Sequence, residues 1–251
     1  MGRGGAWGVG SLMALALLAS ALDAQQRVRE PAGYVGVNLV RADPISPLDL
    51  YFDQGWGGQV YGTFPLEATR HLRLRADLGF LIYGNERQRV CFGGTVGCRV
   101  DLDMSTTNSI VYGGLGPELV LATGVVEPYV HMSFGFSYFA TTTSLSGVND
   151  LESFASSTNF SDGMLAWQGG GGVRLQLSRG RTPVALDVGV ERHQNGVAEF
   201  LTKGDIIDHP DGSITVLPNR SEANLMTVRL GVTIGIPHKG RDYQGRRYRR
   251  H

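Results

Sequence analysis

A histidine and a serine stand two residues apart, as His131 and Ser133, and these residue types can act together in nucleophilic catalysis. Because successive side chains of a strand point to opposite faces, both would lie on one face of a strand. Glu118 would supply the orienting acid if two neighbouring strands align, which would complete a nucleophile, a base and an acid. The same residue types also build hydrogen-bond networks inside closed proteins. We favour the network and predict no catalytic residues.

Charged residues form a second set, and they alternate with apolar residues along several segments. Four arginines and four carboxylates share the polar side of these segments, namely Arg73, Arg75, Asp77, Glu118, Arg174, Asp187, Glu191 and Arg229. Charges removed from water persist when they are paired and hydrogen-bonded. The planar guanidinium suits such pairing better than a lysine ammonium. We therefore predict an internal ion-pair network; the alternative is a set of independently solvated charges on a water-facing sheet.

Two further polar motifs do not match known ligand sites. The glycine run 169–172 is not followed by the Lys-Ser/Thr pair of a phosphate loop, and mid-strand glycines more often mark bends or close packing. Residues 204–224 hold Asp205, Asp208 and Asp211 without the spacing of an EF-hand. We predict no metal site and no cofactor; weak cation binding is the alternative for the acidic segment.

The segments that must position these residues show apolar and polar residues alternating with period two. Eight segments carry this pattern: 33–41, 56–66, 71–84, 109–121, 127–140, 163–177, 184–192 and 224–236. In the last of them, Arg229 lies on the polar face and Val232 on the apolar face. Leu225 interrupts that polar face, and the pattern gives no reason for it.

The connections between these segments alternate in length. Short turns follow the second, fourth and sixth segments, whereas the other connections are long: 42–55, 85–108, 141–162 and 193–223. In an up-and-down sheet, all the short turns would therefore lie at one end and all the long loops at the other. An even strand count with this asymmetry is typical of bacterial outer-membrane barrels.

Composition indicates which face of the strands is outside. The chain has 36 glycines in 251 residues, whereas the usual share is about 7%. The polar faces are rich in glycine, and Lys203 and Lys239 are the only lysines in the sequence. A soluble barrel would wet its polar face, but the interior of an eight-stranded barrel is the place that needs small residues. We predict that the apolar face meets lipid and the polar face lines the lumen.

The two ends of the chain differ from its middle. Residues 1–24 resemble a secretory signal peptide, with Arg3 followed by a short apolar core and small residues; the alternative is a buried or amphipathic first helix. The formal net charge is +0, but residues 237–251 hold six Lys or Arg and one Asp. We therefore predict a signal peptide over 1–24, a barrel over 25–236 and a basic periplasmic tail over 237–251.

Cys91 and Cys98 are the two cysteines of the chain, and they flank a glycine-rich segment. In an exported protein this spacing favours a disulfide that closes a loop tip. Free thiols are the alternative.

Aromatic residues gather near the long-loop ends of the apolar faces, where Trp56, Phe80, Tyr138 and Trp167 would form an interfacial girdle. For Phe80 in particular, an ordinary core position is the alternative.

The signal peptide, the eight alternating segments and the loop asymmetry together resemble the small outer-membrane β-barrel proteins of Gram-negative bacteria, the OmpA-like transmembrane, OmpX and OmpW type. The last strand departs from that type, because it ends in Gly-Ile-Pro and a basic tail instead of a terminal aromatic residue. The resemblance implies an all-β, eight-stranded, antiparallel up-and-down transmembrane barrel with short periplasmic turns and long extracellular loops.

The resemblance also implies a structural or surface-interaction role, with a lumen closed by ion pairs. The expected partners are outer-membrane lipid, lipopolysaccharide and an extracellular partner at the loops, with no nucleic acid and a monomeric state. Two alternatives are a narrow pore for small solutes and a lipid A-modifying enzyme such as an acyl hydrolase. For the enzyme, residues 192–196 (RHQNG) resemble the His-x-Ser-Asn element of lipid A deacylases, but the serine is missing.

Overall fold

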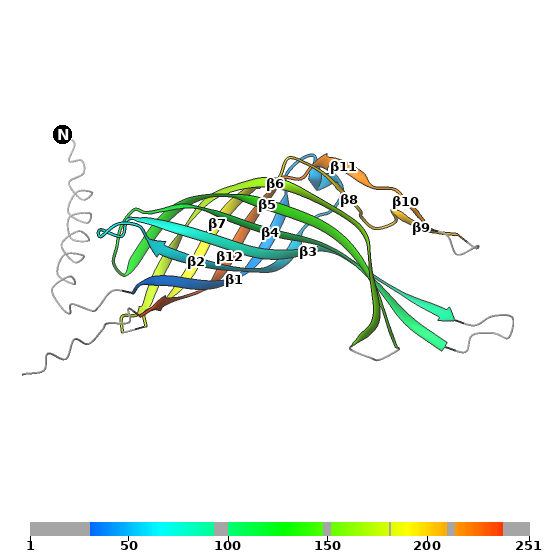
Figure 1. Cartoon of the computed structure of the whole chain (residues 1–251), viewed down its shortest axis with the longest axis horizontal. Helices are drawn as coiled ribbons and strands as arrows, with labels where there is room; N and C mark the ends of the chain where they lie inside the picture. Colours follow the sequence, from blue (N-terminus) through cyan, green and yellow to red (C-terminus); the bar gives the residue numbers. More distant parts are fainter. Residues whose placement is uncertain (1–30, 93–99, 148–151, 181, 210–213, 238–251) are drawn as a thin grey trace, which may run out of the picture.

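The computed structural model describes residues 31–92, 100–147, 152–180, 182–209 and 214–237. Eight antiparallel strands close into one barrel in the order β1-β12-β7-β6-β5-β4-β3-β2 (Figure 1). They are β1 (Gly33–Pro44), β2 (Gly55–Pro65), β3 (Leu72–Phe92), β4 (Val100–Val120), β5 (Val126–Gly147), β6 (Ser153–Ser178), β7 (Val184–Gln194) and β12 (Leu225–Ile236). This architecture confirms the predicted eight-stranded antiparallel barrel.

The outer wall of the barrel is apolar, and its polar side chains point inward. In β12, Val228 and Leu230 are 44% and 52% exposed, whereas Arg229 between them is 1% exposed. The same alternation runs through the other strands, which is the reverse of a soluble barrel. Because a strand of about 9–11 residues crosses a bilayer, the 12 residues of β12 suffice to span it. The barrel is therefore a transmembrane one, as predicted.

Charged residues mark where the apolar wall ends. Along β1 the outward side chains are Val35, Val37 and Leu39, and then Arg41, which pairs with Asp43 at 2.8 Å. The guanidinium of Arg41 also lies 6.0 Å from the ring centre of Trp56. Charged groups and tryptophan together are typical of the boundary between hydrocarbon and headgroups. Among the described residues, no helix is long and apolar enough to cross a membrane.

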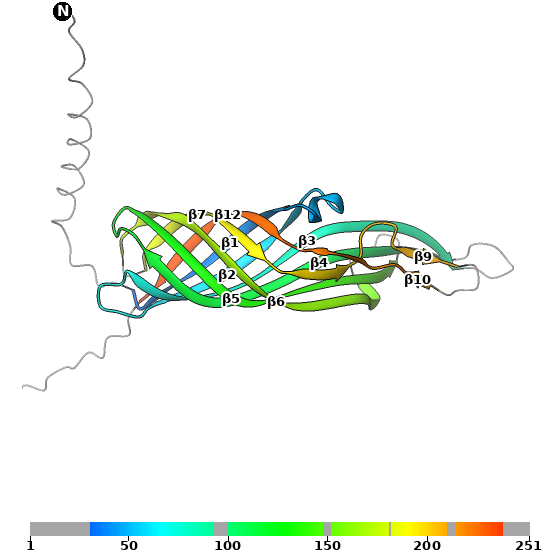
Figure 2. The same ribbon diagram turned by 90° about the horizontal axis from the view of Figure 1, so that it is seen from above.

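Four strands run far beyond the barrel, which corrects the sequence prediction. Residues 85–108 and 141–162 were expected to be loops, but much of both segments continues β3 to β6 as a four-stranded sheet (Figure 2). Serine and threonine hydroxyls pair across this extension, as in the 2.9 Å contact between Thr106 and Thr143. Runs of consecutive polar residues, such as 105–109, 141–144 and 156–159, interrupt in the extension the alternation that marks a half-buried strand.

The long segment between β7 and β12 is also ordered into short strands. β8 (Val197–Phe200) pairs with β11 (Asn219–Glu222), and β9 (Ile206–Asp208) pairs with β10 (Ile214–Val216). The connection between β1 and β2 contains a 3-10 turn, η1 (Leu48–Leu50). Both connections lie at the long-loop end of the barrel (Figure 1).

At the opposite, short-turn end, the turn between β2 and β3 is held by a carboxylate. Glu67 accepts hydrogen bonds from the Thr69 hydroxyl and, at 3.1 Å, from the backbone N–H of Leu72. These donors, the hydroxyl foremost, lower the pKa of Glu67 below its usual value. Arg70 follows with a φ of 61°, so this turn reverses the chain within a few residues.

An apolar cluster closes the mouth of the barrel at the long-loop end. Phe200 and Leu48 from the two folded connections meet barrel residues there, and the cluster comprises Val40, Ala42, Leu48, Leu81, Tyr83, Ile110, Tyr112, Phe139, Ala198, Phe200, Ala223 and Leu225. We name this set the apolar cap. Leu225 interrupts the polar face of β12 because it belongs to this cap, where it is 1% exposed.

Several predicted features fall outside the described residues. These are the signal peptide over 1–24, the tail from residue 238 onward, and Cys98. Cys91 lies near the end of β3. The disulfide between Cys91 and Cys98 therefore stays a prediction.

The outer wall yields a direct test with two equally simple substitutions. Val37 lies on the membrane wall of β1 and is 60% exposed, whereas Leu50 lies in η1 and is 80% exposed. We expect Val37→Arg to lower the free energy of unfolding in lipid vesicles by about 2–4 kcal/mol, because the charge enters hydrocarbon. Leu50→Arg should change it by less than about 0.5 kcal/mol. Urea titration of both variants measures the difference, and equal costs would contradict a lipid-facing wall.

Candidate functional site: the barrel lumen

The lumen near the short-turn end holds a cluster of buried arginines and glutamates. Arg174 contacts Glu118 at 2.6 Å and Glu127 at 3.0 Å. Arg73 adds a 2.7 Å contact to Glu127, and Arg75 adds a 3.1 Å contact to Glu118. All five side chains are at most 5% exposed. We name this cluster the ionic belt.

Two tyrosines stack on the ionic belt from the adjoining layer of the lumen. The guanidinium of Arg75 lies 3.9 Å from the ring centre of Tyr61, and that of Arg174 lies 4.0 Å from the ring centre of Tyr129. Both hydroxyls donate to Asp187 at 2.6 Å. Asp187 therefore differs from the prediction: its carboxylate is satisfied by two phenols, and no arginine of the described chain bridges it.

The middle of the lumen is organised around Glu191. Its carboxylate contacts Arg229 at 3.0 Å and His131 Nε2 at 2.9 Å. Gln59 donates to the same carboxylate at 3.3 Å and to Asp77 at 3.5 Å. Asp77 in turn contacts Arg75 at 2.7 Å. The structure thus joins the middle layer to the ionic belt through Asp77.

The structure brings seven of the eight predicted charged residues into direct ion pairs, and it adds partners that sequence reasoning missed. Glu127, Tyr61, Tyr129 and Gln59 all point inward, and none was in the predicted network. Glu127 shares the strand parity of His131, so alternation alone could have included it. The tyrosines and the glutamine carry no charge, and charge balance could not reveal them.

Glycines make room for these large side chains inside the wall. A methyl group at Gly36 would overlap the Tyr61 ring, and one at Gly79 would overlap the Tyr112 ring. Each tyrosine lies across the bare backbone of a neighbouring strand. This close approach explains why the lumen face is rich in glycine.

The residues considered for catalysis do not assemble into a catalytic set. The Ser133 hydroxyl donates to Asp77 at 3.0 Å, whereas His131 Nε2 contacts Glu191. Glu118 is the register partner of His131 in the neighbouring strand, yet its carboxylate binds Arg75 and Arg174. A nucleophile must lie within hydrogen-bond reach of its base, and within the described residues these two side chains do not bond to each other.

The residues of the RHQNG motif have structural partners. His193 packs edge-on against Tyr112, with ring centres 4.7 Å apart. Asn195 accepts a hydrogen bond from Ser137 at 2.7 Å and donates to the backbone carbonyl of Ala223. In the acidic segment, Asp205 accepts hydrogen bonds from Thr202 and Asn219. Asp211 lies outside the described residues, and the described chain has no cluster of three or more metal-binding side chains.

The four aromatic residues predicted for the girdle all lie on the outer surface. Trp56 is 56% exposed, Phe80 52%, Tyr138 40% and Trp167 41%. Phe80 is therefore a wall residue, and the alternative of an ordinary core position is wrong for it.

Comparisons with known proteins give structural likenesses at low identity. No family model matches the chain, and no curated protein matches it. Neisserial surface protein A is 13% identical, with 82% of this chain and 97% of that chain covered and a TM-score of 0.43. A major outer-membrane protein of Thermus thermophilus is 15% identical (79% and 98% covered, TM-score 0.40), and Ail of Yersinia pestis is 12% identical (82% and 98% covered, TM-score 0.37).

The architecture itself identifies the class of protein. A closed eight-stranded barrel with an apolar outer wall and a buried polar interior is an outer-membrane β-barrel. The chain is thus a small transmembrane β-barrel protein of the outer-membrane type.

The ionic belt predicts a large cost for unpairing one charge. We expect Arg174→Met to lower the free energy of unfolding by about 3 kcal/mol, because Glu118 and Glu127 would lose their shared partner in a buried site. Arg89 is the matched control: it pairs with Asp103 at 3.6 Å but its side chain is 65% exposed. Arg89→Met should cost less than about 1 kcal/mol. Urea titration in lipid vesicles measures both.

A second substitution separates charge pairing from packing. Adding Glu118→Gln to Arg174→Met removes one of the stranded carboxylates, so the double variant should recover part of the lost stability. Equal costs for Arg174→Met and Arg89→Met, or no recovery in the double variant, would contradict the ionic belt as a coupled unit.

Proposed function

We propose that the protein is a closed outer-membrane barrel with a structural and surface-interaction role. The observation that carries the proposal is that the lumen is filled at two levels, by the ionic belt near the short-turn end and by the apolar cap at the long-loop end. The interior of an eight-stranded barrel is just wide enough for side chains. A barrel filled in this way offers its outer wall to lipid and its long-loop end to partners.

The charges in the lumen support closure because they satisfy each other. An ion crossing the barrel would have to separate Arg174 from Glu118 or Arg229 from Glu191, and each of these side chains is at most 1% exposed. Separating such a pair is unfavourable because it leaves buried charges without their partners. A narrow pore, which is the second candidate, would need a continuous path past both pairs and past the apolar cap.

A lipid A-modifying enzyme is the third candidate, and the geometry of His131 and Ser133 does not favour it. Mass spectrometry of lipid A from cells with and without the protein decides the point. An unchanged lipid A profile agrees with a non-enzymatic barrel, whereas loss or gain of an acyl chain would establish the enzyme.

The chain organisation that fits this role has three parts. Residues 1–24 are removed on export, residues 25–236 form the barrel, and residues 237–251 remain in the periplasm as a basic tail. The long-loop end, with the extended strands β3 to β6, then faces outward toward lipopolysaccharide and extracellular partners. Trp56, Phe80, Tyr138 and Trp167 hold the barrel at the membrane boundary as an aromatic girdle, and the barrel works as a monomer.

Closure of the lumen is tested by electrical recording. We expect the purified protein in planar bilayers to show no steady conductance. Phe200→Ala alone should stay closed because the ionic belt and the two tyrosine rings stacked on it remain. Combining it with Tyr61→Ala and Tyr129→Ala should give steady conductance, because the apolar cap is opened and Arg75 and Arg174 lose the rings that hold them across the lumen. Steady conductance of the unaltered protein would show that the barrel is a pore.

Orientation is tested with trypsin on intact cells. The Lys203 side chain is 82% exposed at the long-loop end, so we expect cleavage after Lys203 while an epitope on the basic tail is retained. Lys203→Gln is the control and should remove that cleavage. Loss of the tail epitope without cleavage after Lys203 would place the long loops in the periplasm and contradict the proposed orientation.

A further inference from the structure

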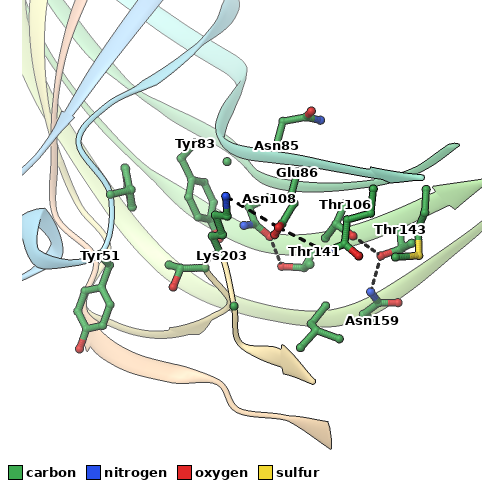
Figure 3. A pocket seen from close by; sticks show the side chains of 17 residues that line it. Tyr51, Tyr83, Asn85, Glu86, Thr106, Asn108, Thr141, Thr143, Asn159 and Lys203 are labelled. Carbon is green, nitrogen blue, oxygen red and sulfur yellow. Dashed lines mark hydrogen bonds and ion pairs between the residues drawn. The ribbon is translucent and has the colours of Figure 1, made fainter. Parts of the chain in front are cut away.

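A cavity of about 360 Å³ lies at the long-loop end, above the apolar cap. Its walls come from the extended parts of β3 to β6 and from the segment that carries Lys203 (Figure 3). The volume falls within the usual range for small-molecule sites, about 300–1,000 Å³. The cavity contains none of the ionic-belt residues.

One wall of the cavity is a ladder of uncharged hydrogen-bonding side chains. The Thr141 hydroxyl donates to Asn108 at 2.7 Å, Thr106 pairs with Thr143 at 2.9 Å, and Asn159 donates to Thr143 at 2.7 Å. These bonds use the side-chain carbonyl of Asn108 and the side-chain N–H of Asn159. Within the described chain, no hydrogen bond uses the side-chain N–H of Asn108 or the side-chain carbonyl of Asn159. The ladder therefore keeps both a donor and an acceptor for a ligand.

The base of the cavity is aromatic. Tyr51, Phe52 and Tyr83 line it, and the rings of Phe52 and Tyr83 lie 4.7 Å apart with an angle of 33° between their planes. Tyr83 is anchored by a hydrogen bond from its hydroxyl to the backbone carbonyl of Leu201 at 3.2 Å. The cavity thus offers a ring surface on one side and amides with hydroxyls on the other.

The charges at the cavity cancel each other. Lys203 and Glu86 are the lining residues that carry charge, and their side chains form an ion pair at 3.9 Å (Figure 3). An anionic ligand would have to compete with Glu86 for Lys203, which is the one cation among the lining residues. A fatty acyl chain would strand the amide and hydroxyl groups of the ladder, which is unfavourable.

We propose that this cavity binds an uncharged sugar, of the size of one or two hexose units, presented outside the cell. A sugar ring has a C–H face that packs on aromatic rings and a rim of hydroxyls that both donate and accept hydrogen bonds. The aromatic base and the Asn–Thr ladder supply these two surfaces. The inference rests on the proposed outward orientation of the long-loop end.

Two substitutions on one strand give a matched test. Thr143 belongs to the ladder, whereas Thr142 lies on the opposite face of β5, paired in register with Thr107 and Thr158. Thr143→Val removes a hydroxyl that contacts both Thr106 and Asn159. Thr142→Val makes the same chemical change outside the cavity.

The experiment measures binding to the full chain in detergent micelles by saturation-transfer NMR and calorimetry. The probes are maltose, lactose and N,N′-diacetylchitobiose, with sucrose octasulfate as the anionic comparison. We expect at least one neutral probe to bind more tightly than the sulfated one. Thr143→Val should weaken that binding about tenfold or more, while Thr142→Val should keep it within about twofold.

Other outcomes overturn the inference. Binding by none of the neutral probes at about 10 mM, a concentration above the weakest affinities expected for a specific site, tighter binding of the sulfated probe, or equal binding by Thr143→Val and the unaltered protein would each exclude the neutral-sugar site. None of these results bears on the orientation, which the trypsin experiment tests separately, or on the closed lumen, which the conductance recording tests.

Discussion

Pairing of buried arginines with carboxylates is the constraint on which the rest of this barrel depends. With the outer wall in lipid, the charged side chains of the strands are confined to the lumen, which has room only for side chains, so these charges must pair with one another there. Arginine fits this space because its planar fork serves two carboxylates at once, as Arg174 does with Glu118 and Glu127. The same crowding explains the glycines, since Tyr61 reaches Asp187 only by lying across Gly36.

The two ends of the lumen are closed by different physical means because the chain differs there. At the short-turn end the connections are too short to fold inward. Side chains of the barrel strands alone fill the lumen there, as paired arginines and glutamates with tyrosine rings packed against the guanidinium groups. At the long-loop end the connections are long enough to place Leu48 and Phe200 over the mouth, and hydrophobic burial does the sealing. Within β12, the inward side chains change from the charged Arg229 of the polar lumen to Leu225 of the apolar cap.

Alternation made the barrel predictable, and the limits of alternation explain what was missed. All eight membrane strands and the inward position of Arg229 follow from period two, because one face meets lipid and the other does not. In the extension of β3 to β6, runs of consecutive polar residues interrupt that contrast, so residues 85–108 and 141–162 looked like loops. Asp187 was placed in the ion-pair network because charge balance cannot reveal a tyrosine partner. The apolar cap forms where two connections that are far apart in the sequence pack together, and residue periodicity within a single segment cannot predict such packing.

The length of the extended strands sets how far this protein stands above the membrane. β6 has 26 residues, and about 11 suffice to cross the bilayer. At about 3.3 Å per residue, the remainder amounts to on the order of 50 Å of strand, shortened by tilt. The sheet therefore extends well beyond the barrel wall, and in the proposed orientation it would carry its tips past the lipid headgroups on the outer side of the membrane.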